Sequence, residues 1–217
     1  YQLSPYGPSL EDQKSNDGVP AGSLDTSYVC VTDQHGNIFS CTPSDVAKDS
    51  PIIPGTGLCP SSRGSQSWAI PGHPCSIEPG KRPRLTPNPA LAIRKDEFAI
   101  PFGTPGGDIQ VQAMLQCLLN LIEWKLDPQQ SVEAPRFGSH SFPDSFEPHD
   151  YHPGKLMLES WFDDDLYSEL NGLGHLTEEW PNLTWKAGAV CMIYSNLKSG
   201  IQTAGADPRR PTYAVGW

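Results

Sequence analysis

The alternation of apolar and polar positions near the start of the chain predicts a β-hairpin. Two short runs rich in β-branched and aromatic residues, 28–32 and 38–42, flank the tripeptide His35-Gly36-Asn37. Glycine adopts at little cost the positive φ that tight hairpin turns require. We therefore predict two strands that meet at this turn.

Two further pairs of strand-like runs occur later in the chain. Residues 90–94 are followed closely by 97–102, and residues 188–196 by 200–205. In each pair a short polar connection separates runs of β-forming residues, which is the pattern of an antiparallel hairpin.

Helical spacing predicts three helices between these strands. The longest begins after Gly107, and shorter helices are predicted over 129–136 and 161–173. The last has Asp163, Asp164 and Asp165 at its start, where the helix dipole favours negative charge. Strands at both ends with helices between them indicate the α+β class. The apolar face of the longest helix comprises Ile109, Val111, Met114, Leu115, Leu118, Leu119 and Ile122.

Two segments have the composition of loops. Residues 43–89 contain turn-forming residues every few positions and no sustained period, and residues 1–25 combine few apolar residues with several Pro, Gly and Ser. We expect the first to form long loops that are functional or mobile, and the second to be a flexible tether. The remaining chain, 26–217, is expected to form one domain.

The charge of the chain bears on its partners. With a formal net charge of −10 and a pI near 4.9, the chain is acidic, and nucleic acid and anionic membranes would repel it. It contains no apolar run of the roughly 20 residues that a membrane span needs. We therefore predict neither a nucleic-acid partner nor a membrane partner.

The cysteines and histidines give no metal-binding pattern. The six cysteines and six histidines are scattered, without Cys-x-x-Cys or closely spaced His pairs, so no metal site is predicted. Cys30, Cys41 and Cys191 fall in strand patterns and Cys117 in a helix, where we expect small buried thiols. Free thiols favour a cytoplasmic location, and the sequon at Asn182 is too common a pattern to outweigh them. A periplasmic or secreted location stays open, because the start of a longer precursor would lie outside this sequence.

Thr26 is the candidate nucleophile. It precedes the first predicted strand and follows a loop of Gly, Pro, Ser and acidic residues, 18–25. If the bond between Asp25 and Thr26 is cut, the freed α-amine lies beside the Thr26 hydroxyl and can act as its general base. The alternative interpretation is an ordinary threonine at a strand edge.

Six motifs in order carry a resemblance to a known family. They are Thr26-Ser27 with Asp33-x-x-Gly36-Asn37 and Ser40, Pro54-Gly55-Thr56-Gly57, Pro79-Gly80-Lys81-Arg82-Pro83, Gly103-Thr104-Pro105-Gly106-Gly107, Ala134-Pro135-Arg136-Phe137, and Ala206-Asp207-Pro208-Arg209 at the end of the domain. Together they resemble the small subunit of the gamma-glutamyltranspeptidase family of N-terminal-nucleophile hydrolases.

The resemblance covers residues 26–217 and implies a four-layer αββα sandwich completed by a large subunit outside this chain. It also implies a precursor that cuts itself before the threonine. Residues 1–25 would then be the C-terminal tail of the large subunit, and the large subunit would be the protein's partner.

The same resemblance assigns further site residues. Ser44 lies where the family has a second threonine that contacts the nucleophile, and Thr86 keeps the second hydroxyl of a substrate-supporting pair. Gly106 and Gly107 would hold the oxyanion. The residues themselves agree, since two glycines at a helix start expose unpaired N–H groups to a ligand. A glycine turn required for helix–sheet packing is the alternative.

Arg63 separates this chain from the transpeptidases. No acidic residue that could bind a substrate ammonium occurs between Asp49 and Glu78, and Val46 replaces a substrate-holding Asn of the family. Arg63 instead offers a planar cationic fork that suits a carboxylate. This resembles the amidohydrolase branch, which includes oxamate amidohydrolase and the cephalosporin acylases. A solvated or structurally paired arginine is the alternative.

These residues predict a self-processing threonine amidohydrolase. Its substrate would be a small-molecule amide with a carboxylate-bearing acyl group, which passes through an acyl-enzyme on Thr26, and no cofactor is expected. Two alternatives remain open: a gamma-glutamyltranspeptidase or glutathione hydrolase, and a processing-deficient, non-catalytic member of the family.

Overall fold

The computed structural model describes residues 26–45 and 51–217. The predicted tail 1–25, the bond between Asp25 and Thr26, and the substitution noted at Val46 lie outside the described residues.

The first element is the predicted hairpin. Strands β1 (Val29–Thr32) and β2 (Ile38–Cys41) pair antiparallel, with Val29 opposite Cys41. At the turn Gly36 has a φ of +82°, and the carboxylate of Asp33 accepts hydrogen bonds from the backbone N–H groups of His35 and Asn37. The turn chemistry predicted for this stretch is confirmed.

The second element is a four-stranded antiparallel sheet in the order β3-β4-β8-β9. Both later hairpins predicted from the sequence are found in it, and β4 pairs with β8 so that Phe102 lies opposite Met192. The strands are β3 (Ala90–Arg94), β4 (Phe98–Gly103), β8 (Cys191–Asn196) and β9 (Gln202–Ala206).

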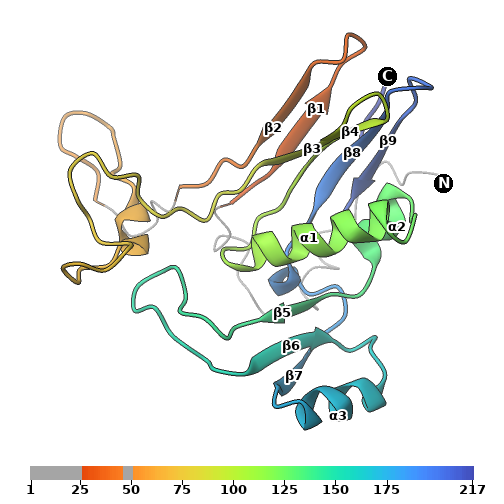
Figure 1. Cartoon of the computed structure of the whole chain (residues 1–217). Helices are drawn as coiled ribbons and strands as arrows, with labels where there is room; N and C mark the ends of the chain where they lie inside the picture. The colour runs from red at the N-terminus through yellow and green to blue at the C-terminus, as the bar shows by residue number, and fades with distance from the viewer. Residues whose placement is uncertain (1–25, 46–50) are drawn as a thin grey trace.

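Two helices cover one face of this sheet (Figure 1). Helix α1 (Ile109–Ile122) buries Met114, Cys117 and Leu121 against strand residues, and α2 (Pro128–Glu133) follows it. The predicted apolar face is only partly right, because the sheet covers a narrower stripe that leaves Val111 and Leu115 56% exposed. Helix α2 ends earlier than predicted because Ala134 precedes a proline and adopts an extended ψ of 147°. The main apolar core lies between these helices and the sheet.

The third element is a three-stranded sheet that was not predicted from the sequence. Strand β6 (Lys155–Glu159) pairs antiparallel with β5 (Phe137–Ser139) and parallel with β7 (Leu176–Trp180). Helix α3 (Asp164–Gly172) forms the crossover between β6 and β7. Strand β5 has three residues and β7 is mostly polar and exposed, so neither gives a clear period.

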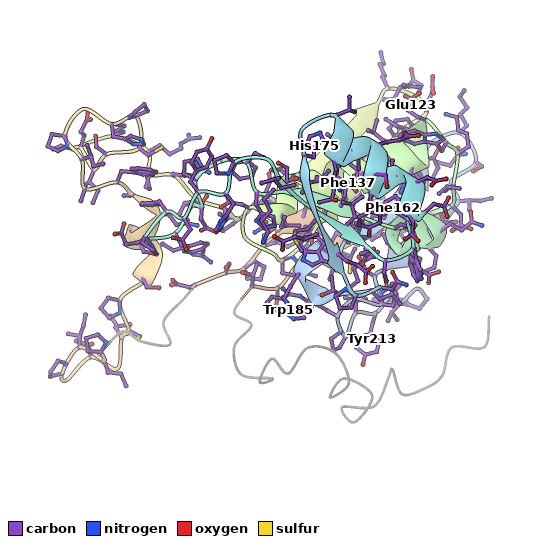
Figure 2. All side chains as sticks on the ribbon, turned by 90° about the horizontal axis from the view of Figure 1, so that it is seen from below. Glu123, Phe137, Phe162, His175, Trp185 and Tyr213 are labelled. Carbon is purple, nitrogen blue, oxygen red and sulfur yellow. The ribbon has the colours of Figure 1, made fainter. Side chains whose placement is uncertain are left out.

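Of the long loops predicted over 43–89, the described part from residue 51 onward extends away from the body in Figure 1 and again in Figure 2, where the molecule is seen from below. One turn of 3-10 helix, η2 (Ser62–Gln66), interrupts them and was not predicted. A second, η3 (Trp185–Ala187), precedes β8. The loop residues that bear on function lie on or near η2.

The layers follow from how these elements pack. Hairpin β1–β2 contacts β4 and β8 on the face of the four-stranded sheet opposite α1 and α2. The described layers are therefore helix, sheet and hairpin. On the hairpin, Val29, Val31 and Phe39 are about half exposed, so this layer presents apolar surface outward. Three layers of an αββα sandwich are present in the described residues.

A buried ion cluster joins two of the motifs recognised in the sequence. Arg136 pairs with Asp207, and Arg209 pairs with both Asp207 and Glu159, its Nε donating to Glu159 Oε1 at 2.7 Å. All four side chains are nearly inaccessible to solvent. The cluster ties the end of β6 and the loop after α2 to the segment after β9, so both motifs are structural.

Candidate active site

Thr26 is held next to Ser44. The two residues form an isolated antiparallel bridge, and the Thr26 Oγ1 lies 2.6 Å from the Ser44 Oγ. The N–H of Ser27 donates to the carbonyl of Pro43 at 3.0 Å, which fixes the backbone beside the bridge. The hairpin brings these residues together because its strands run antiparallel from the turn back to this end.

Arg63 connects Ser44 to Thr86. Its Nη2 donates to the Ser44 Oγ, and its Nη1 donates to the Thr86 Oγ1 at 3.4 Å. Four candidate residues taken from distant parts of the sequence thus form one continuous chain of hydrogen bonds. The Arg63 guanidinium is thus paired with two hydroxyls of this chain, as one of the two alternative interpretations has it, and Ser44 connects it to Thr26.

Gln66 supports this chain and was missed in the sequence. Its side chain is fully buried, its Nε2 donates to the Thr86 Oγ1 at 3.0 Å, and its Oε1 accepts from the Thr86 N–H. Nothing in its sequence surroundings, a polar loop, distinguishes a buried glutamine from a solvated one.

Gly106 and Gly107 lie at the start of α1. Gly107 has a φ of +56°, which favours glycine, and lines an open cavity of about 300 Å³ together with Thr86. Their N–H groups donate to no acceptor within the described part of the chain. A Cβ at Gly106 would lie 3.5 Å from the Gly188 Cα, an ordinary contact, so the available space does not require glycine there. The φ of +132° at Gly106 does favour glycine.

Side chains from three segments fix this helix start. Asp108 accepts from the N–H of Ser145 at 2.7 Å and from its hydroxyl, and the Arg84 Nε donates to the same hydroxyl at 2.9 Å. Before the glycines, the buried Thr104 hydroxyl accepts from the Ala189 N–H and donates to the Pro105 carbonyl, both at 2.6 Å. Hydrogen bonds of Thr104 before the two glycines and of Asp108 after them therefore fix the turn that contains Gly106 and Gly107.

Comparison with known proteins decides the family. The sequence profile described as Gamma-glutamyltranspeptidase matches residues 4–217. The chain belongs to the gamma-glutamyltranspeptidase family. This membership confirms the N-terminal-nucleophile hydrolase fold expected from the sequence.

Relatives of this gamma-glutamyltranspeptidase-family chain include acylases and amidohydrolases. It is 34% identical over 202 residues to the Acylase ACY 1 proenzyme of Pseudomonas sp. (strain SE83), covering 91% of this chain and 34% of the relative. It is 27% identical over 219 residues to the Oxamate amidohydrolase proenzyme of Klebsiella pneumoniae, covering 99% of this chain and 40% of the relative. The chain thus spans between one third and two fifths of these relatives' length.

A solved structure shows the same likeness. The structure of LmbA2991T421A superposes with a TM-score of 0.80 at 34% identity, covering 89% of this chain and 34% of that one. The arrangement of sheets and helices described above is therefore shared with a protein about two and a half times as long.

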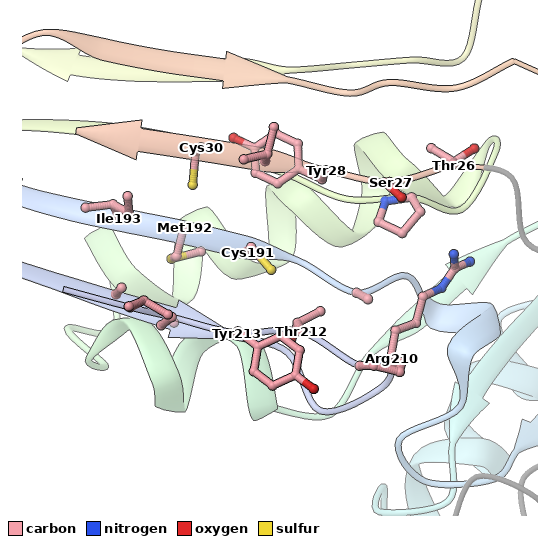
Figure 3. A pocket seen from close by; sticks show the side chains of 18 residues that line it. Thr26, Ser27, Tyr28, Cys30, Cys191, Met192, Ile193, Arg210, Thr212 and Tyr213 are labelled. Carbon is pink, nitrogen blue, oxygen red and sulfur yellow. The ribbon is translucent and has the colours of Figure 1, made fainter. Parts of the chain in front are cut away.

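A second cavity of this gamma-glutamyltranspeptidase-family chain, about 360 Å³, lies on the other side of Thr26 (Figure 3). Strands β1, β8 and β9 and the segment 210–215 line it. Burial raises the pKa of the Tyr28 hydroxyl and the Cys30 thiol, and raises that of Cys191 to about 11. At neutral pH these three groups are uncharged, whereas Arg210, which also lines this cavity, carries a positive charge.

The thiols are less buried than predicted. Only Cys117 is fully buried, whereas Cys30, Cys41 and Cys191 are half-buried. Within residues 26–45 and 51–217, no group of three or more His, Cys, Asp or Glu side chains is arranged to hold a metal ion. The same residues contain no helix that is long and apolar enough to cross a membrane.

Proposed function

We propose that this chain carries the catalytic residues of a self-processing threonine amidohydrolase that acts on small carboxylate-bearing amides. The observation that supports this most directly is the contact of 2.6 Å between the Thr26 and Ser44 hydroxyls, in a chain of hydrogen bonds that includes Arg63. An ordinary strand-edge threonine has no need of a second hydroxyl and a guanidinium beside it.

The proposed reaction has two steps after self-cleavage between Asp25 and Thr26. The freed α-amine takes the proton of the Thr26 hydroxyl as its oxygen attacks the amide carbonyl, and then gives that proton to the departing amine. Water next attacks the resulting ester in the same way and releases the acid. The N–H groups of Gly106 and Gly107 are proposed to hold the oxyanion, and the loss of one such donor typically costs about 100- to 1000-fold in kcat. No cofactor takes part in this scheme.

Arg63 is proposed to select the acyl group, with Thr86 beside it. A gamma-glutamyl group would place its ammonium near the guanidinium, and at ~4 Å this costs about 4 kcal/mol at an effective dielectric of 20, roughly a thousandfold in affinity. A terminal carboxylate on the acyl group would instead be attracted to the Arg63 guanidinium. The name of the oxamate amidohydrolase relative agrees with this preference, because oxamate carries a free carboxylate.

The large subunit of the same precursor is the proposed partner. In the described residues neither β1 nor β2 has a neighbour on its outer edge, and the cavity of 360 Å³ lies beside β1 and over β9. Strand β3, at the edge of the four-stranded sheet, also presents apolar surface, because Leu91 is 48% exposed and Ile93 is 63% exposed. Strands from the large subunit, added beside the hairpin and beside β3, would cover these apolar side chains. The six free thiols favour a cytoplasmic location for the assembly.

The test is self-cleavage followed by kinetics. Intact mass of the full-length precursor should show a fragment that begins at Thr26, and Thr26→Ala should leave the precursor uncut. The matured enzyme should then show a higher kcat/KM for glutaryl-p-nitroanilide than for gamma-glutamyl-p-nitroanilide, and Arg63→Ala should reduce this preference. Cleavage of the Thr26→Ala variant at the same bond would show that the threonine is not the agent.

A glutathione hydrolase or gamma-glutamyltranspeptidase is the second candidate, favoured by the description of the family profile itself. Preference of the wild type for the gamma-glutamyl compound, or an unchanged ratio in Arg63→Ala, would support it. A wild-type precursor that stays uncut and inactive would instead indicate a non-catalytic member of the family.

A further inference from the structure

One aromatic ring contacts both ends of the proposed acyl site. The guanidinium carbon of Arg63 lies 5.6 Å from the centroid of the Phe146 ring, over its face. On the other side, the Cε2 of the same ring lies 3.8 Å from the point that a Cβ of Gly107 would occupy. Phe146 therefore lies between the proposed carboxylate anchor and the proposed oxyanion donors, and the function proposed above does not use it.

The backbone that carries Phe146 is fixed on both sides. The preceding residue, Ser145, is bonded to Asp108 at the start of α1, and the N–H of the following residue, Glu147, donates to the Ser65 carbonyl of η2 at 2.9 Å. The ring is thus tied by its neighbours to the same two elements that it contacts. These hydrogen bonds of the neighbouring residues fix the position of the Phe146 ring.

A stack of three rings strengthens the tie to the Arg63 loop. Trp68 lies between His73 and His149, with ring centroids 4.1 Å apart in both pairs and interplanar angles of 16° and 9°. His149 is 8% exposed and is three residues from Phe146. Flat stacking of this kind orients the two loops relative to each other as well as holding them together.

We infer that Phe146 is the wall of the acyl pocket that sets the length of the acyl group. This inference rests on the proposed function. An acyl group whose carboxylate meets Arg63 and whose carbonyl oxygen meets Gly107 must run along this ring, because the ring touches both. The space between anchor and oxyanion site is therefore short, which suits small dicarboxylic acids linked through one amide.

The test compares acyl chains of increasing length in the matured, full-length enzyme. The substrates are malonyl-, succinyl-, glutaryl- and adipyl-p-nitroanilide, with butyryl-p-nitroanilide as the uncharged compound. Phe146→Ala should raise the ratio of kcat/KM for adipyl over succinyl by about tenfold, the effect of one to two methylenes in an apolar pocket. Phe146→Trp should lower the same ratio, and Phe142→Ala, in the same loop and 37% exposed, should leave it within about twofold.

The two variants of Phe146 change the pocket in opposite directions, so the result does not depend on one of them folding well. If wild type hydrolyses the carboxyacyl compounds and both variants keep its length profile, the role of Phe146 is overturned and the proposed function stands. If wild type hydrolyses none of the compounds, the proposed function fails, and this inference fails with it. A third outcome is that the Phe146 variants change the preference for carboxyacyl compounds over butyryl-p-nitroanilide but keep the wild-type dependence on chain length. That outcome would mean that Phe146 acts through Arg63, and it would also overturn the inference.

Discussion

The Thr26 Oγ1 and the Ser44 Oγ are 2.6 Å apart, and the Ser44 oxygen also accepts a hydrogen bond from Arg63. A serine hydroxyl has a single proton and two lone pairs. With one lone pair occupied by a guanidinium that can only donate, Ser44 is free to direct its proton to Thr26. In the proposed mechanism, the hydroxyl proton of Thr26 is then available for transfer to the α-amine of the same residue.

We expect Ser44→Ala to slow turnover by about 10- to 100-fold, because a charged donor loses its acceptor and Thr26 loses its donor. Ser44→Thr keeps the hydroxyl and should retain activity within about threefold. Steady-state kinetics of both variants after confirmed maturation provides the measurement. Equal activity of the Ala variant and wild type would remove Ser44 from the mechanism.

Gly107→Val should abolish turnover and leave the fold intact. At a φ of +56° a β-branched residue is strained by about 1–2 kcal/mol, and the backbone must turn away from the geometry that exposes its N–H. Loss of one oxyanion donor predicts a decrease in kcat of about 100-fold or more. Circular dichroism and melting temperature are the controls, and full activity would disprove the oxyanion assignment.

Arg209→Met should destabilise the protein by about 3–5 kcal/mol, since it leaves Glu159 buried without its main partner. The matched control is Arg94→Met, which removes a partner of Glu97 in an exposed pair and should cost about 0–1 kcal/mol. Denaturant midpoints of the two variants provide the comparison. Similar midpoints would show that the buried cluster adds little.

The thiols beside Thr26 should react slowly with alkylating agents. Because burial raises the pKa of Cys191 from 9.0 to about 11, its thiolate fraction at pH 8 is lower by about 100-fold than that of an ordinary thiol. Differential alkylation read by mass spectrometry should show Cys59, which is exposed, reacting first.

The same shift has a consequence for stability at high pH. Between pH 9 and 11 the unfolded thiol of Cys191 loses its proton while the folded one keeps it, so the native state loses stability as the pH rises through this window. Rapid labelling of Cys191 at pH 8 in the folded protein would contradict both expectations.

Local chemistry explains which elements could be predicted. The turn at Gly36 and the acidic start of α3 are each encoded within a few residues, and both were found at or near the expected positions. The position of α1 was also predicted, but its buried face was only partly right, because local spacing does not show which stripe of an apolar helix the sheet covers. The sheet β5-β6-β7 is different, because strand β7 is stabilised by parallel pairing with β6 and not by a period of its own.

The residues of the candidate site also divide into those that the sequence indicates and those that only the structure shows. Family motifs led to Thr26, Ser44 and Thr86, and a departure from them led to Arg63. The buried Gln66 and the ring of Phe146 act through contacts with residues 20 or more positions away. A buried polar side chain in a polar loop, and one of several aromatic residues in a Pro-rich loop, carry no local signal that sets them apart, so only the three-dimensional structure reveals them.

The anchoring of Thr26 bears on the entropy of the proposed maturation. Two contacts already hold this residue: the Ser27 N–H bonded to Pro43, and the hydroxyl bridge to Ser44. A chain end created at Thr26 would keep both and would not fray as new termini usually do. Ordering one residue costs about 1–2 kcal/mol in lost backbone freedom, and here that ordering belongs to the folding of the hairpin. Cleavage would thus convert a fixed internal position into a fixed terminus, so that the catalytic amine is formed already in place.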